Sequence, residues 1–352
     1  MTSIAAVARL AGVSIATASR VVSEADYPVS PTTRERVLDA ARTLDYVPNA
    51  LARGLLKSQL PVIGVIVHDI TDPYFAEVVR GVEDGAESSG YLVITCSDER
   101  DGAREASYVR LLRSMRAAGV IFAGSGLDDP ASREETPRHV SAMLASGGAV
   151  VHLSPHAQGR PDVGVDNRGG ICSMIEALVE LGHRRIAFLA GPATLYVARE
   201  RLAGYRDGLA SAAIEIDARL IVESGFDAES GAQAVDRLLE SGVQFSAISC
   251  ANDLLALGAL QRLHERGIRV PDELSVAGFD DIAVAQMTAP SLTTVRLPLR
   301  ELGRLGFAAA VGMLAGKPVE PITLPTEVVL RDSTASRTPS PVAPATASRN
   351  IQ

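Results

Sequence analysis

Apolar residues in the first 60 positions recur at the spacing of helix faces, and residues that favour helix starts precede the apolar stretches. Ser3, Ser14 and Ser30 are placed to cap helices, and Pro31 stands at a first helical position. Gly12 permits a tight turn after the first stretch. The pattern predicts four short helices, at about residues 4–11, 15–22, 31–44 and 50–57.

Beyond residue 61 the pattern changes to short apolar runs that alternate with helical stretches. Runs that are apolar on both faces are typical of parallel strands covered by helices on both sides. The predicted strands are Val62–Val67, Tyr91–Thr95, Gly119–Ala123, Ala149–Leu153, Arg185–Ala190, Arg219–Val222, Ser246–Cys250 and Leu274–Ala277. The helical patterns include Tyr74–Ser89, Arg104–Arg116, Gly169–Leu181, Arg199–Ala212, Ser230–Glu240 and Asp253–Arg266. An α/β fold with parallel sheets is expected.

A weak internal repeat divides this α/β region. The strand Ile63–Val67 leads to a helical segment with Gly81, and the strand Ile186–Ala190 leads to a similar segment with Gly204. The repeat predicts two similar lobes. Ligands of such folds bind outside the carboxyl ends of the strands, which here means the cleft between the lobes.

The same pattern predicts the division of the chain. We expect an all-α head at residues 1–47, a hinge helix and linker at 48–60, and a two-lobed body at 61–332. The first lobe is expected at about 61–160 plus 293–325, and the second at about 161–290 plus 326–332. Residues 333–352 are rich in Ser, Thr, Pro and Ala and predict a disordered tail.

The charge distribution separates the head from the body. Residues 1–60 carry seven Lys or Arg and five Asp or Glu, a net charge of +2, whereas the remainder of the chain carries −10. A mildly basic head on an acidic body suits a protein that touches phosphates with one end only.

Other features exclude several classes of protein. Cys96, Cys172 and Cys250 are isolated, so neither a zinc site nor a disulfide framework is implied, and no cofactor is expected. The N-terminus lacks the pattern of a signal peptide, and no apolar run reaches the length of a membrane span. We therefore expect a cytoplasmic protein with no membrane partner.

The first two predicted helices and the turn between them have the residues of a helix-turn-helix DNA-binding unit. Ala8 lets two helices approach closely, Gly12 supplies the turn, and Val13 and Val21 bury the second helix against the first. Ile15 and Ala16 are the candidates for base edges, and their chemistry allows contact with thymine methyl groups. The hydroxyls of Ser14, Thr17 and Ser19 suit phosphates, and Arg20 suits guanine or a phosphate.

The segment from Val7 to Val22 resembles the head of the lactose-repressor (LacI/GalR) family. The similarity continues through ordered motifs over essentially all of residues 3–332. These include Pro48-Asn49, Asp72-Pro73-Tyr74-Phe75, Asp166-Asn167, Gly191-Pro192, Arg201-Leu202-Ala203-Gly204-Tyr205, Ala251-Asn252-Asp253 and Gly278-Phe279-Asp280-Asp281. The resemblance implies a helix-turn-helix head with a hinge helix, and a body like periplasmic binding proteins.

It also implies how the protein meets DNA. A homodimer would read the half-sites of a pseudo-palindromic double-stranded operator, with the fourth helix in the minor groove. Asn49 and Arg53 would contact DNA there, and Leu55 would wedge into a base step. A helix of about eight residues is marginal alone in water, so the hinge helix should order only with DNA and the second subunit.

For the cleft, the resemblance places effector contacts at strand ends and in loops between the lobes. Aromatic faces would stack on C–H surfaces, and the charged and amide groups would bind vicinal hydroxyls, which fits a sugar or polyol. The loop residues Leu195 and Val197 and the pair Leu153-Ser154 make the site more apolar than is usual, so the identity of the effector stays open. The candidate residues are Asp69, Tyr74, Phe75, Arg199, Phe226, Asn252 and Asp280.

Two other classes of protein fit these motifs less well. No HExxH sequence, P-loop or dinucleotide fingerprint occurs, and the six histidines are scattered, which disfavours an enzyme. The body alone would fit a periplasmic solute-binding protein, but the head and the lack of a signal peptide disfavour one. Repression is favoured over activation, because a dimer on an operator near a promoter most simply blocks polymerase. Whether the ligand releases DNA or strengthens its binding stays open.

Overall fold

The computed structural model describes residues 3–23, 27–46, 59–157, 159 and 161–337. In the head it has α1 (Ile4–Ala11), α2 (Ile15–Val22) and α3 (Pro31–Thr43), which confirms the first three predicted helices. The hydroxyls of the predicted caps accept the backbone N–H of the residue three positions on. The predicted hinge helix at 50–57 lies outside the described residues.

Small and β-branched side chains hold the three helices together. Val7, Ala8, Val21 and Val37 are buried at their common centre. Gly12 has a φ of 62°, the left-handed conformation that the turn after α1 needs. Among the described helices, none is by itself long and apolar enough to cross a membrane; α1 and α2 would pass only as a pair, and they are bent by 105°.

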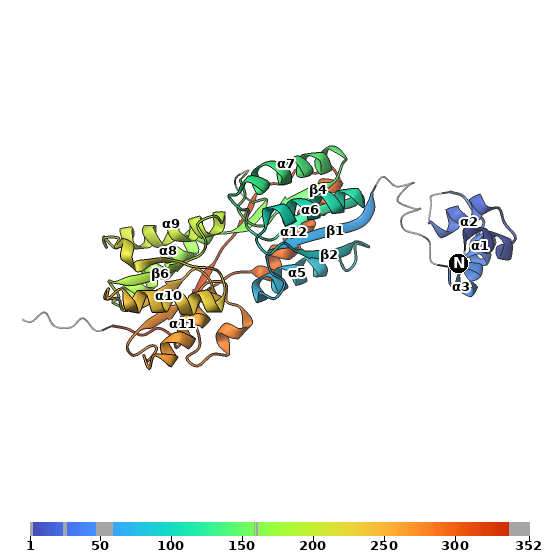
Figure 1. The fold of residues 1–352 in the computed structure, drawn as a ribbon. Coiled ribbons are helices and arrows are strands. Elements are labelled where there is room, and N and C mark those ends of the chain that lie inside the picture. The colour runs from blue at the N-terminus through green and yellow to red at the C-terminus, as the bar shows by residue number, and fades with distance from the viewer. Residues whose placement is uncertain (1–2, 24–26, 47–58, 158, 160, 338–352) are drawn as a thin grey trace, which may run out of the picture.

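The first lobe is a parallel four-stranded sheet with the order β2-β1-β3-β4. Helices α6 and α7 cover one face, and α5 and α12 cover the other (Figure 1). The strands are β1 (Leu60–Val67), β2 (Leu92–Ser97), β3 (Ala117–Phe122) and β4 (Ala149–His152), and the helices are α5 (Pro73–Ala86), α6 (Gly102–Ser114), α7 (Pro130–Ala145) and α12 (Leu299–Leu314). The predicted strands of this lobe are confirmed.

The second lobe repeats the plan with the parallel order β7-β6-β8-β9. Helices α8 and α9 pair on one face and α10 and α11 on the other (Figure 1). The strands are β6 (Ile186–Ala190), β7 (Ile221–Glu223), β8 (Ala247–Cys250) and β9 (Ser275–Ala277), and the helices are α8 (Asn167–Glu180), α9 (Tyr196–Ser211), α10 (Ala228–Glu240) and α11 (Asp253–Glu265). Two 3-10 turns, at Ala218–Leu220 and Ala283–Gln286, complete the lobe.

Short strands where the chain passes between the lobes correct the predicted lobe boundaries. β5 (Val163–Val165) pairs with β11 (Ile322–Leu324) and packs on the first-lobe helix α12, so 163–165 belongs with the first lobe and not the second. β10 (Thr294–Arg296) pairs with β12 (Glu327–Val329) and packs on α8, so 294–296 belongs with the second lobe and not the first.

The predicted disordered tail begins too early at residue 333. Ser333 is fully buried in the second lobe, where its hydroxyl donates to the carbonyl of Val276 and accepts the N–H of Thr293. The N–H of Arg337 donates to the carbonyl of Leu181. Composition does not reveal this segment, because long-range hydrogen bonds, and not apolar side chains, hold it. Residues 338–352 lie outside the described residues.

The repeated glycines mark close helix crossings. A Cβ on Gly81 of α5 would lie 2.0 Å from the carbonyl oxygen of Arg300 of α12, and one on Gly303 would lie 2.0 Å from that of Val78. In the second lobe, a Cβ on Gly204 of α9 would lie 2.2 Å from the carbonyl oxygen of Arg168 on α8. Only glycine fits at these distances, so both lobes use the same device to pair helices.

Candidate functional site

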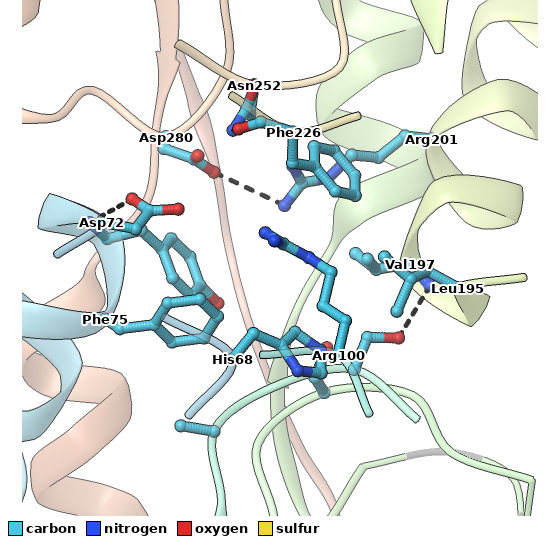
Figure 2. Close-up of a pocket in the computed structure, with 14 residues that line it drawn as sticks. His68, Asp72, Phe75, Arg100, Leu195, Val197, Arg201, Phe226, Asn252 and Asp280 are labelled. Atoms are coloured by element: carbon cyan, nitrogen blue, oxygen red, sulfur yellow. Dashed lines mark hydrogen bonds and ion pairs between the residues drawn. The ribbon is translucent and has the colours of Figure 1, made fainter. Parts of the chain in front are cut away.

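A cleft between the lobes gathers aromatic, charged and small side chains, as Figure 2 shows, and several of them follow the carboxyl ends of parallel strands. Both lobes contribute to it, as expected for a ligand site at strand ends. Its lining residues are His68, Asp72, Tyr74, Phe75, Arg100, Ala123, Ser125, Ser154, Leu195, Val197, Arg201, Phe226, Asn252 and Asp280.

Arg201 is the central charge of the second-lobe wall. Its Nε donates to Asn167 Oδ1 at 3.1 Å, its Nη1 donates to the carbonyl of Ala251 at 2.6 Å, and its Nη2 lies 3.4 Å from Asp280 Oδ1. The guanidinium also lies over the ring of Phe279, 4.2 Å from its centroid. Buried and held on several sides, Arg201 is fixed in the geometry that forked recognition of oxygen atoms requires.

Asp280 faces Arg201 from the loop after β9. Burial raises the pKa of Asp280 well above its ordinary value, although the nearby charge of Arg201 opposes the shift. Its φ of 119° is a backbone conformation that L residues rarely adopt. A strained residue at the end of a strand is typical of a ligand site, where the surrounding structure holds a side chain in place.

Asn252 and Phe226 form a second contact group of this wall. Asn252 caps α11, since its Oδ1 accepts the N–H of Leu255 at 3.0 Å, and its Nδ2 donates to the carbonyl of Phe226 at 3.0 Å. The carboxamide therefore has a structural role as well as a place in the lining, and it fixes the loop that carries the Phe226 ring. That ring packs against Gly191, where a Cβ would lie 2.2 Å from it.

The first-lobe wall is aromatic with one buried acid. Asp72 caps α5, with its Oδ1 accepting the N–H of Tyr74 at 2.9 Å. Burial raises the pKa of Asp72, and that hydrogen bond opposes the shift. Tyr74 and Phe75 meet edge to face with centroids 4.9 Å apart. The wall offers ring faces for C–H surfaces and a carboxyl group for hydroxyls.

Besides Asp72 and Arg201, the lining has three further polar groups in the first lobe that the sequence did not identify as effector contacts. His68 directly follows β1, and Arg100 and Ser125 lie in the loops after β2 and β3, so all three stand beyond the carboxyl ends of first-lobe strands. Their position just after predicted strands was the signal that could have identified them. Figure 2 shows the Arg100 side chain extending from the first lobe into the cleft.

Two predicted effector residues are absent from the lining. Asp69 accepts the N–H and the hydroxyl of Thr71, at 2.8 and 2.7 Å, and so closes the turn after β1. Arg199 donates to Asp128 Oδ2 at 2.6 Å and to the carbonyl of Ala193 at 2.7 Å, so it joins the lobes at the rim. Arg199 and Arg201 are two positions apart, which corresponds to about 200° around a helix. Arg201 therefore faces the cleft and Arg199 does not.

The head presents the predicted DNA-reading face. Ile15 is 55% exposed, Ala16 and Arg20 are exposed, and the Ser14 hydroxyl accepts the N–H of Thr17 at 3.0 Å as an N-cap. Thr17 and Ser19 are partly exposed. The guanidinium of Arg20 lies 4.2 Å from the ring centroid of Tyr27. The contacts of these residues with DNA stay predictions, and Asn49, Arg53 and Leu55 lie outside the described residues.

Two family models match the chain. Residues 3–49 match the model described as bacterial regulatory proteins, lacI family. Residues 175–334 match the model of a periplasmic binding protein-like domain. The two matches fall on the helical head and on the body, with the second lobe largely inside the latter.

Relatives and solved structures match over nearly the whole chain. The HTH-type transcriptional repressor CytR of Escherichia coli (strain K12) is 34% identical over 330 residues, covering 93% of this chain and 95% of the relative. A structure of the lac repressor dimer bound to operator and the anti-inducer ONPF has a TM-score of 0.83 at 31% identity and covers 95% of this chain and 99% of its own. A complex of the transcriptional regulator CelR with cellobiose has a TM-score of 0.70 at 31% identity, covering 95% and 100%.

Proposed function

The chain belongs to the lacI family of bacterial regulatory proteins, and we propose that it is a ligand-responsive repressor of transcription. It binds a pseudo-palindromic operator as a homodimer, and its affinity for DNA changes when a sugar or related polyol binds between the lobes. It acts in the cytoplasm, where the DNA is, and as a regulator and not as an enzyme.

The observation that carries the effector proposal is the immobilised Arg201 fork in a cleft that also holds aromatic rings from both lobes. A guanidinium fixed by Asn167 and Asp280 offers oriented N–H groups to ligand oxygens, while Phe75 and Phe226 supply apolar faces. Sugars have both kinds of surface. The CelR structure, which contains cellobiose, supports the same ligand class.

The homodimer proposal has support in the lac repressor dimer and in exposed apolar side chains of the body. Among the described strands β2 pairs with β1 alone, and its Leu92 is 60% exposed. Met287 in the second lobe is 79% exposed, and Ile70 in the loop after β1 is 48% exposed. An exposed apolar side chain on a sheet edge, such as Leu92, is a liability in a monomer, and large exposed apolar side chains in general suit a subunit interface.

The test is a gel shift of genomic fragments with the full chain, followed by addition of sugars and polyols to the shifted complex. We expect a salt-sensitive, sequence-specific shift whose strength changes with one class of sugar. Arg201→Ala should keep the shift and lose the response. No specific shift at any salt concentration would refute a DNA-binding regulator, and a response that Arg201→Ala preserves would refute the cleft as the effector site.

A further inference from the structure

A buried histidine in the first-lobe wall has its two ring nitrogens in different situations. His68 Nδ1 lies 2.9 Å from Asp98 Oδ1, and the same oxygen accepts the N–H of Arg100 at 2.8 Å. His68 is 4% exposed and Asp98 is 1% exposed. Because the Asp98 carboxylate only accepts hydrogen bonds, Nδ1 carries a proton and donates it. The pairing fixes the ring and leaves Nε2 for another partner.

Nε2 of His68 has no hydrogen-bond partner among the described residues, although it is buried. The ring cannot easily turn away, since it meets Phe75 edge to face at 5.7 Å and lies against Gly124, where a Cβ would be 2.8 Å from it. His68 lines the cleft. A buried polar nitrogen that is held without a partner at a cleft is a position where a ligand group can supply the missing bond.

Arg100 stands beside this histidine in the same wall. Its Nε is also buried without a partner among the described residues, and its guanidinium lies 5.8 Å from the ring centroid of Phe226 in the second lobe. Its φ of 59° is a left-handed conformation, which costs free energy in a residue with a side chain. Asp98 stabilises that turn by accepting the Arg100 N–H, so one carboxylate orients both groups.

We propose that His68 and Arg100 form a specificity-determining subsite of the first lobe that binds two neighbouring oxygens of the effector. A hydroxyl lies against His68 Nε2, and the second oxygen accepts from Arg100. A hydroxyl both donates and accepts, so it pairs with Nε2 whether or not that nitrogen is protonated. Asp98 is the positioning residue. The inference rests on the proposed function, and it names the group of the sugar or polyol that the first lobe recognises.

The experiment uses the full chain and calorimetric titration with matched probes. These are D-ribose, D-glucose and cellobiose, each with its single-deoxy analogues. His68→Asn keeps a donor toward Asp98 but removes the group that faces the cleft. His68→Gln is the matched control, because its longer amide places a polar atom near the position of Nε2 and loses the bond to Asp98. Thermal melting verifies that each variant is folded.

We expect the wild type to prefer one hydroxylated sugar over one of its deoxy analogues by roughly tenfold, the effect of one hydrogen bond. His68→Asn should bind the two alike, His68→Gln should keep part of the preference, and Asp98→Asn should reduce it. If a sugar binds and His68→Asn discriminates every deoxy analogue as the wild type does, the subsite is refuted while the proposed function stands. If no probe binds although the operator shift is intact, the sugar effector and this subsite both fail.

Discussion

Arg199 Nη2 lies 2.6 Å from Asp128 Oδ2 and joins the second-lobe helix α9 to the first-lobe loop after β3. The hydrogen bond from Arg199, with a second one from Arg133, holds the pKa of Asp128 below its ordinary value. Two further hydrogen bonds join the lobes next to this ion pair. Asp128 N–H donates to the carbonyl of Thr194 at 2.8 Å, and Val197 N–H donates to the hydroxyl of Ser125 at 3.1 Å. The rim of the cleft is thus a set of contacts that lobe opening must break.

We predict that Arg199→Ala weakens effector binding by roughly two- to fivefold, because the lost ion pair is partly exposed and solvent screens it. Arg201→Ala should weaken it far more, since the buried Asp280 would lose its cation. Calorimetric titration at low and high salt measures both variants. The difference between Arg199→Ala and wild type should shrink at high salt. Equal losses from the two arginines would contradict the rim role of Arg199.

A second prediction concerns two glycines of one helix. Gly303→Ala in α12 should destabilise the protein by about 1–3 kcal/mol, because the added Cβ would lie 2.0 Å from the Val78 carbonyl oxygen of α5. Gly312→Ala is the matched control: nothing lies within 4 Å of the new Cβ, and alanine should stabilise the helix by roughly 0.5–1 kcal/mol. Urea unfolding of both variants measures the two signs. A loss of stability in Gly303→Ala no larger than in Gly312→Ala would exclude the close crossing.

The long apolar strands were predictable because burial on both faces leaves a mark in consecutive residues, as in Val62–Val67. Four of the three-residue strands, β5, β10, β11 and β12, leave no such mark, whereas β7 and β9, which are as short, overlap predicted apolar runs. Their partners are remote in sequence, for instance Val163 opposite Ile322. For that reason the lobe boundaries, and the order of Ser333 and its neighbours, could not be derived from periodicity.

The sequence predicts part of the cleft lining but not all of it. Tyr74, Phe75, Phe226, Asn252 and Asp280 line it as expected, because strand ends fix their position. The predicted contact Arg199 does not line the cleft, whereas Arg201 does, because the two residues lie on different sides of α9 and a sequence does not say which side faces the cleft. His68 and Arg100 also lie after strands, but only the structure shows that Asp98 orients both of them.

The third prediction concerns Glu105 of α6, which accepts the hydroxyl of Thr136 at 2.9 Å. Burial raises its pKa from 4.5 to about 7. Between these values the folded protein retains a proton that the unfolded chain has released, so stability falls as pH rises through this window, by up to about 3 kcal/mol. Glu105→Gln removes this contribution, and urea unfolding from pH 4 to 8 checks it.

The diagnostic quantity is the difference in stability between Glu105→Gln and wild type at each pH. Burial also raises the pKa of Asp253 to about 7, so the wild-type slope has more than one source. We expect the variant to gain on the wild type as pH rises from about 4.5 to 7. Parallel stability curves for the two proteins would mean that Glu105 titrates alike in the folded and unfolded chains.

The last prediction tests the apolar reading of DNA by the head. Ile15 is 55% exposed in the first turn of α2, and its side chain can contact a thymine methyl group but cannot donate a hydrogen bond. Ile15→Ala should weaken binding to an operator selected with the full chain by roughly three- to tenfold, the effect of losing one or two buried methyl contacts. Replacing the contacted thymine with uracil should weaken the wild type and leave Ile15→Ala unaffected. Leu10→Ala is the control: it shortens a side chain on α1 that is 56% exposed, and it should bind the operator as the wild type does. If each thymine-to-uracil replacement weakens the wild type and Ile15→Ala equally, the contact is excluded.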